Sequence, residues 1–120
     1  MQNILYHNNR CRKSREALDY LREKGLEPTV IEYLKTPLTA SQWQEVFTSI
    51  GKKPSEMVRT QEALWKENYK GKKISEIALL DILTDHPKLI ERPIYQQNNR
   101  GVLARPIENL IDFLKKSQTD

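Results

Sequence analysis

Hydrophobic and polar positions in the first third of the chain predict a strand, a helix and a second strand. A short apolar stretch from Ile4 to Tyr6 predicts the first strand. A polar turn from His7 to Lys13 leads into a helix from about Ser14 to Lys24, whose apolar residues share one face. Gly25 is expected to end this helix in the left-handed conformation. Residues 29–33 are rich in β-branched types and predict the second strand, which a short right-handed crossover should make parallel to the first.

The middle of the chain carries helical periodicity and no strand pattern. Thr39 and Gln42 have the spacing of a capping box, and apolar residues at helical spacing follow them. Residues 54–68 are less regular and are expected to be helical in pieces. Ser75 is expected to cap a further helix that runs to about Thr84. Because that segment is apolar nearly all round, we expect it to be largely buried.

The last third of the chain predicts a hairpin and a final helix. Ile94-Tyr95 and Val102-Leu103 resemble two short strands, and Asn-Asn-Arg-Gly at 98–101 is a turn signal between them. Pro106 is placed to open the last helix. The order is therefore β-α-β, an all-helical insertion over about residues 38–88, and β-β-α. This order predicts one α/β domain over residues 1–120, with a mixed four-stranded sheet and a thioredoxin-like fold.

Composition narrows the classes of function. The chain has one cysteine, which excludes an internal disulfide and a structural zinc site of several thiolates, and its two histidines are far apart. We therefore expect no metal. The apolar runs are too short for a membrane span or a signal peptide, so a cytoplasmic protein without a membrane partner is expected. A net charge of +4 indicates at most a preference for anions, and no nucleic-acid-binding motif is present.

The stretch around Cys11 is the candidate for chemistry. It joins a predicted strand to a helix N-terminus, where free N–H groups and a positive dipole favour a thiolate and a small oxyanion. Four cationic residues are expected to add positive charge around the sulfur, although successive helical residues face different ways. His7 and Ser14 can donate hydrogen bonds to it. The alternative, that Cys11 is a small buried apolar residue, is less favoured because its neighbours are charged or amide residues. The four cationic residues are Arg10, Arg12, Lys13 and Arg15.

Two Arg-Pro steps lie at predicted structural joints. Arg92-Pro93 precedes one strand of the hairpin, and Arg105-Pro106 follows the other. Proline pushes the preceding residue toward extended backbone, so each arginine is held at the end of a strand. The residues alone leave open whether either arginine lines a site.

These blocks together resemble the arsenate reductase family of ArsC type. Residues 6–15, Tyr-His-Asn-Asn-Arg-Cys-Arg-Lys-Ser-Arg, are similar to that family's Y-H-N-x-x-C-x-x-S-R. Residues 86–94 are similar to its H-P-x-L-I-x-R-P-I, and Arg105-Pro106 to the R-P before its final helix. The resemblance covers essentially the whole chain. The flanks of the cysteine are more basic here than is usual in the family.

The resemblance implies a role for each matching residue. Cys11 matches the nucleophile that forms a thiol–arsenate adduct. The three arginines that would hold the oxyanion are Arg59, Arg92 and Arg105. The residues that would position the cysteine or stabilise its thiolate are His7, Asn8 and Ser14. Pro93 matches a proline that such folds hold cis. Because the chain has one cysteine, a resolving thiol must come from outside. The resemblance implies glutathione as co-substrate and then glutaredoxin as partner, which would resolve the adduct and release arsenite.

Two other functions remain as alternatives. The first is a related thiol oxidoreductase whose substrate is not arsenate, which the altered cysteine flanks favour. The second is a Spx-like regulator that binds RNA polymerase. The usual redox switch of that group is a Cys-x-x-Cys pair, whereas the second position here is Ser14.

Overall fold

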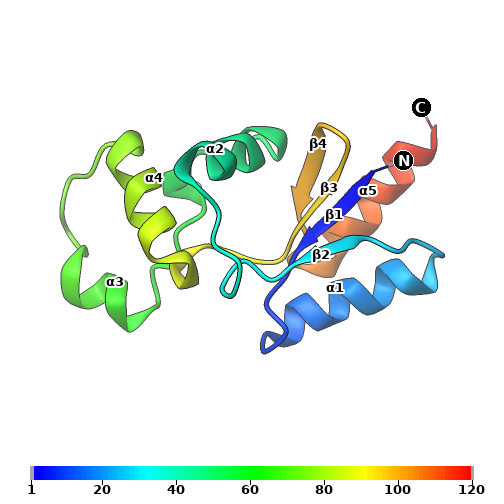
Figure 1. Cartoon of the computed structure of the whole chain (residues 1–120), viewed down its shortest axis with the longest axis horizontal. Coiled ribbons are helices and arrows are strands. Elements are labelled where there is room, and N and C mark those ends of the chain that lie inside the picture. The colour runs from blue at the N-terminus through cyan, green and yellow to red at the C-terminus, as the bar shows by residue number, and fades with distance from the viewer. Residues whose placement is uncertain (1, 120) are drawn as a thin grey trace. The chain divides into compact units, whose positions relative to one another are not determined.

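The structure, a computed structural model, describes residues 2–119, with side chains through Ser117. The chain forms two compact units (Figure 1). One, here called the sheet unit, comprises Met1–Thr36 and Arg92–Asp120. The other, here called the helical unit, comprises Pro37–Glu91. The helical unit is inserted between the two halves of the sheet unit, close to the insertion expected over residues 38–88.

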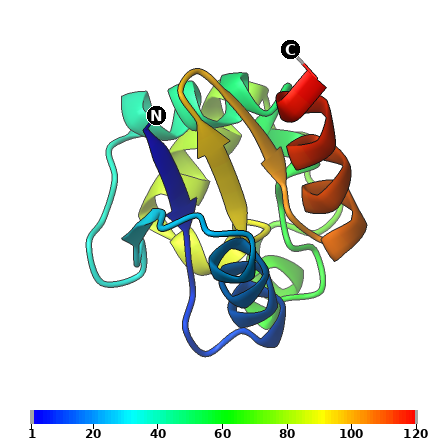
Figure 2. The same ribbon diagram turned by 90° about the vertical axis from the view of Figure 1, so that its right-hand side faces the viewer.

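The sheet unit contains a mixed four-stranded sheet in the order β2-β1-β3-β4. β1 pairs with β2 in parallel, whereas β1 with β3 and β3 with β4 are antiparallel. The predicted strands, their directions and the final hairpin are thus confirmed. Two helices, α1 and α5, complete the unit (Figure 2). The bounds are β1 Asn3–Tyr6, α1 Arg12–Glu23, β2 Thr29–Ile31, β3 Ile94–Gln97, β4 Arg100–Leu103 and α5 Ile107–Thr119.

One apolar core joins α1 and α5 to a single face of the sheet. Leu5 of β1 lies opposite Tyr95 of β3, so both side chains point to this face. They pack with Leu21 of α1 and Leu110 of α5, and all four are fully buried. Since strand side chains alternate in direction, the residues next to Leu5 and Tyr95 in their strands point to the opposite face of the sheet. This packing fixes the N-terminus of α1 beside the end of β1.

The helical unit consists of short helices joined by turns. Its largest buried side chain is Trp43, which stacks on Phe47 at 5.7 Å between ring centroids. Backbone hydrogen bonds from Arg59 N to Leu89 O and from Glu91 N to Met57 O join residues 57–59 to residues 89–91, at the C-terminal end of this unit. The bounds are α2 Ala40–Ser49, η1 Pro54–Glu56, α3 Ala63–Asn68, α4 Glu76–Asp85 and η2 Pro87–Leu89.

Three details of the elements differ from the sequence-based expectations. α1 begins at Arg12, two residues before the expected start, because Cys11 acts as its N-cap. The hairpin turn is shorter than expected, since Arg100 already belongs to β4 and Asn98 takes a positive φ of 57°. The expectation that the helix after Ser75 is largely buried was wrong. α4 packs through Leu79 and Leu83, whereas Ile77 on its outer side is 79% exposed.

Among the described residues, no helix is long and apolar enough to cross a membrane. Within the same part of the chain, no group of three or more histidine, cysteine and carboxylate side chains is placed to hold a metal ion.

Candidate active site

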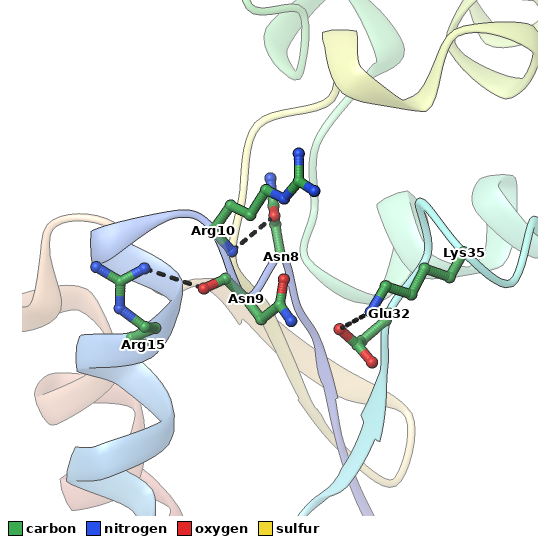
Figure 3. A network of polar contacts seen from close by, with 6 residues as sticks. All are labelled: Asn8, Asn9, Arg10, Arg15, Glu32 and Lys35. Carbon is green, nitrogen blue, oxygen red and sulfur yellow. Dashed lines mark hydrogen bonds and ion pairs between the residues drawn. The ribbon is translucent and has the colours of Figure 1, made fainter.

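Cys11 lies at the N-cap of α1, directly after a tight turn that follows β1. His7 extends the parallel pairing by donating its N–H to Ile31 O at 2.9 Å. The Cys11 N–H then donates to Asn8 O at 2.9 Å, and the Arg10 N–H donates to Asn8 Oδ1 at 3.1 Å (Figure 3). Asn8 therefore folds the turn through both its main chain and its side chain, as asparagine commonly does. The turn holds the sulfur at the beginning of the helix.

Ser14 supports this turn from the first turn of α1. Its side chain is fully buried, and its Oγ accepts a hydrogen bond from the Asn8 N–H at 3.4 Å. Its own N–H interacts with the sulfur of Cys11. From the sequence, Ser14 was expected to donate a hydrogen bond to the sulfur from its side chain. In the structure the main chain interacts with the sulfur, and the hydroxyl holds the turn.

The thiol of Cys11 is buried, yet its surroundings favour the ionised form. Burial raises its pKa, but the N–H groups of Ser14 and Lys13 and the guanidinium of Arg92 outweigh it, so the pKa is lowered. Arg92 acts both by a hydrogen bond to the sulfur and by its positive charge. The side chain makes no conventional capping hydrogen bond. The helix start therefore directs main-chain N–H groups at an ionisable sulfur, which favours a nucleophilic thiolate.

The positive charge near the sulfur comes from a distant part of the chain. From the sequence, the cationic residues flanking Cys11 were expected to surround the sulfur. All four are exposed, and none is among the groups that lower the pKa of Cys11 through its charge. Arg15 instead donates from Nη1 to Asn9 O at 3.0 Å and so ties α1 to the turn (Figure 3). The positive charge near the sulfur is supplied by Arg92, which lies at the start of the second half of the sheet unit.

His7 lies buried directly after β1, where its neutral form is favoured. Burial lowers its pKa, which Glu32 partly opposes and Arg22 and Arg15 reinforce. Its Nδ1 is buried and has no hydrogen-bond partner among residues 2–117. A hydrogen bond from His7 to the sulfur, expected from the sequence, is not among the interactions that lower the pKa of Cys11.

The two Arg-Pro steps meet at the same end of the sheet as the Cys11 turn. Tyr6, the last residue of β1, pairs with Ile94, which in turn pairs with Leu103. The Ala104 N–H then donates to Pro93 O at 2.8 Å. Both the Arg92–Pro93 and the Arg105–Pro106 peptide bonds are cis, although only the first was expected. This register places Arg92, Arg105 and the segment that leads to Cys11 at neighbouring strand ends.

Arg59 belongs to the helical unit, where its surroundings differ. Its Nη1 lies 3.8 Å from Glu62 Oε1, in a partly exposed ion pair. The structure describes this arginine within its own unit, so its assignment to the oxyanion site stays a prediction.

Comparison with known protein families decides the classification. The model of the ArsC family matches residues 6–113, from the end of β1 to the last helix. The chain belongs to the ArsC family. Arsenate reductase of Neisseria meningitidis serogroup A is 38% identical over 108 residues, covering 88% of this chain and 92% of that protein. The protein YfgD of Escherichia coli K12, named as uncharacterized, is 40% identical over 112 residues, covering 92% of this chain and 94% of its own.

Solved structures of ArsC-family members show the same architecture. The structure of arsenate reductase from Vibrio cholerae is 37% identical to this chain and has a TM-score of 0.87. The match covers 93% of this chain and 97% of that one. The expected fold class, a thioredoxin-like mixed sheet with a helical insertion, is therefore confirmed for this ArsC-family chain.

Proposed function

We propose that this ArsC-family protein is an arsenate reductase that uses Cys11 as its nucleophile. The observation that carries the proposal is the sulfur of Cys11, whose pKa is lowered by two main-chain N–H groups and by Arg92. Relatives named arsenate reductase, at 33–38% identity, support the choice of substrate. A thiolate at neutral pH is the form that attacks an electrophilic centre.

The reaction begins with attack of the Cys11 thiolate on the arsenic of arsenate. An S–As bond forms, and one arsenate oxygen leaves as water after protonation. Glutathione thiolate then attacks the Cys11 sulfur, the S–As electron pair passes to arsenic, and arsenite leaves. Two electrons have moved to arsenic, and Cys11 is left in a mixed disulfide with glutathione. A glutaredoxin thiolate attacks the glutathione sulfur, and Cys11 leaves as the thiolate.

Arginine side chains lower the repulsion between a thiolate and an anionic substrate. Arg92 already interacts with the sulfur, and Arg105 lies at the neighbouring strand end. The Arg105 guanidinium has no ion-pair partner among the described residues, which leaves it available to an oxyanion. Planar guanidinium groups suit bidentate binding of a tetrahedral oxyanion. We assign Arg59 to the same role from the family motif.

The neighbours of Cys11 position it and do not react. Asn8 and Ser14 would keep the turn closed through the hydrogen bonds described above. His7 would fill the space beneath the turn without adding a charge, since burial lowers its pKa. A free, ionisable thiol that depends on glutathione fits a reducing compartment, so a cytoplasmic location is part of the proposal.

A coupled assay tests the proposal. Wild-type and Cys11→Ser proteins are incubated with arsenate, glutathione, glutaredoxin, glutathione reductase and NADPH. Arsenate-dependent loss of NADPH in the wild type alone is the expected result, with arsenite detected as the product. Activity that survives in Cys11→Ser would contradict the role of the thiol. Since Cys11 is the only cysteine, alkylation of the wild type with iodoacetamide gives an independent second block.

One observation favours a second candidate, a thiol oxidoreductase acting on another substrate. Arg10, Arg12 and Lys13 are exposed beside Cys11 without ion pairs among the described residues, which leaves room for a larger anionic substrate. Reduction of glutathione mixed disulfides in the absence of any turnover of arsenate would identify this function.

A further inference from the structure

A small pocket lies on the side of the Cys11 turn that faces the end of β2. Its volume is about 210 Å³, and it is lined by the turn residues before Cys11 and by the segment that follows β2. The hydrogen bond from His7 N to Ile31 O joins the two walls at their base. Both walls belong to the sheet unit. The pocket is therefore built by the same turn that positions the nucleophile.

The pocket presents charges of both signs. Arg10 contributes a guanidinium from the turn, while Glu32 and Lys35 contribute a carboxylate and an ammonium from the opposite wall. Glu32 and Lys35 are paired at 3.5 Å, and their side chains are 36% and 67% exposed. Main-chain hydrogen bonds to Glu32 O from Lys35 and Thr36, both 2.9 Å, fold this wall into a tight turn.

Further groups in the pocket are available to a ligand. Arg10 has no ion pair or side-chain hydrogen bond among residues 2–117, and neither has the side-chain amide of Asn9. Figure 3 shows the Asn9 side chain directed across the gap toward Glu32. Leu34, a large apolar residue, is 43% exposed at the same place. A ligand with charged ends and an apolar middle matches this set of groups.

We propose that this pocket binds the glutathione that resolves Cys11, through the two carboxylates and the ammonium of the tripeptide. The inference rests on the proposed function, because only a covalently modified Cys11 needs an external thiol. At neutral pH the two carboxylates of glutathione match Arg10 and Lys35, and its ammonium matches Glu32. Its central cysteine then lies beside the turn that carries Cys11. The thiolate attacks the Cys11 sulfur, arsenite leaves with the S–As electron pair, and the mixed disulfide forms.

Binding is measured without chemistry by using S-methylglutathione, which cannot react. Titration of isotope-labelled wild-type protein should shift the amide resonances of Asn9, Leu34 and Lys35. The variant Glu32→Gln and the double variant Arg10→Gln/Lys35→Gln should each weaken binding by about two- to fivefold, as expected for partly exposed charge pairs. The control Glu27→Gln and the double control Lys72→Gln/Lys73→Gln make the same charge changes at exposed positions outside the pocket and should leave binding unchanged.

Kinetics provide the second measurement. The KM for glutathione should rise in the pocket variants by about the same two- to fivefold factor. The KM for arsenate should stay the same, and so should turnover with dithiothreitol as the only thiol. Glu32 and Lys35 do not touch the sulfur, so a general fault in Cys11 chemistry would change all three quantities together.

Each outcome separates the inference from the proposed function. No saturable binding at millimolar S-methylglutathione, or binding that the pocket variants leave unchanged, would overturn the inference even if arsenate is reduced. Equal losses with glutathione and dithiothreitol would overturn it as well. Binding at the pocket in a protein that does not reduce arsenate would support the inference and contradict the choice of substrate.

Discussion

The starts of α1 and α2 have the same backbone geometry but different chemistry. Their N-cap residues, Cys11 and Thr39, are both extended, with φ of −89° and −78°, and neither helix has an acidic residue in its first turn. At α2 a complete capping box satisfies the first N–H groups: Thr39 Oγ1 accepts from Gln42 N at 3.1 Å, and Gln42 Oε1 accepts from Thr39 N at 2.8 Å. At α1 the corresponding N–H groups interact with the sulfur. The same geometry thus stabilises α2 and favours an anion at α1.

The largest expected effect follows from removal of Arg92, the positively charged residue outside α1 that interacts with the Cys11 sulfur. Arg92→Gln removes the guanidinium from the Cys11 sulfur and should raise the pKa of that thiol. A hydrogen bond to a charged group is worth about 1.5–3 kcal/mol, so alkylation by iodoacetamide at neutral pH should slow by about ten- to a hundredfold. Titration of the thiolate absorbance in the far ultraviolet against pH measures the pKa of Cys11 directly.

Arg59→Gln is the matched control for Arg92→Gln. Arg59 is paired with Glu62 in the helical unit and is not among the groups that lower the pKa of Cys11. Its loss should leave the alkylation rate unchanged while affecting the KM for arsenate. An equal fall in the alkylation rate of both variants would show that Arg92 has no special part in stabilising the thiolate.

The second prediction concerns His7, a buried residue in the turn between β1 and α1. Because the pKa of His7 is lowered in the folded protein, the unfolded chain binds a proton that the folded chain resists. Stability should therefore fall as the pH drops below about 6.5, with a contribution from His7 of at most about 1.4 kcal/mol per pH unit.

Urea unfolding across this pH range measures the slope. In His7→Gln the decline on the acid side should be shallower than in the wild type. An unchanged slope would mean that His7 takes up its proton equally easily in both states.

The third prediction removes the cap of α2. Thr39→Ala leaves the Gln42 N–H without its side-chain partner and should lower the free energy of unfolding by about 1 kcal/mol. Urea denaturation followed by circular dichroism measures this change. The pKa of Cys11 should not move. A shift of that pKa would show that the two helix starts are coupled.

The smallest effect on stability is expected from Cys11→Ser. In contrast to Thr39→Ala, this substitution should raise the free energy of unfolding. Serine is a preferred N-cap, so its hydroxyl should accept from the first-turn N–H groups and stabilise the protein by about 0.5–1 kcal/mol at acid pH. The lowered pKa of Cys11 stabilises the folded wild type above the usual pKa of a thiol, and this contribution is lost as the pH falls through the lowered value. The advantage of the serine variant should therefore shrink as the pH rises. A variant less stable than the wild type at acid pH would contradict the comparison.

Local patterns in the sequence predicted most of the elements. The capping box at Thr39, the glycine after α1 and the antiparallel hairpin all follow from neighbouring residues, so short-range rules found them. The start of α1 was misplaced because cysteine is not a typical N-cap. The burial of α4 was overestimated because an apolar composition does not show how many neighbours a helix has, and only one side of α4 has them.

The site was harder to predict because it depends on contacts between distant segments. The expected position of Cys11 at a helix start is confirmed, but the favourable charge was expected from neighbouring cations. Those side chains point to solvent, and Arg92 reaches the sulfur through strand pairing that no local pattern encodes. The pocket beside Glu32 was missed for the same reason, since its walls lie more than twenty residues apart.

The buried hydroxyl of Ser14 has a consequence for how the chain could acquire a different chemistry. Ser14 stands three residues after Cys11, in the first turn of the same helix, with its side chain enclosed beneath the turn. Exchange of this one oxygen atom for sulfur, through Ser14→Cys, would create a vicinal dithiol at the spacing of oxidoreductase motifs. Such a chain would carry its own resolving group and would no longer depend on the supply of small thiols. The identity of one side-chain atom at this position therefore decides whether the chain needs an external resolving thiol or carries its own.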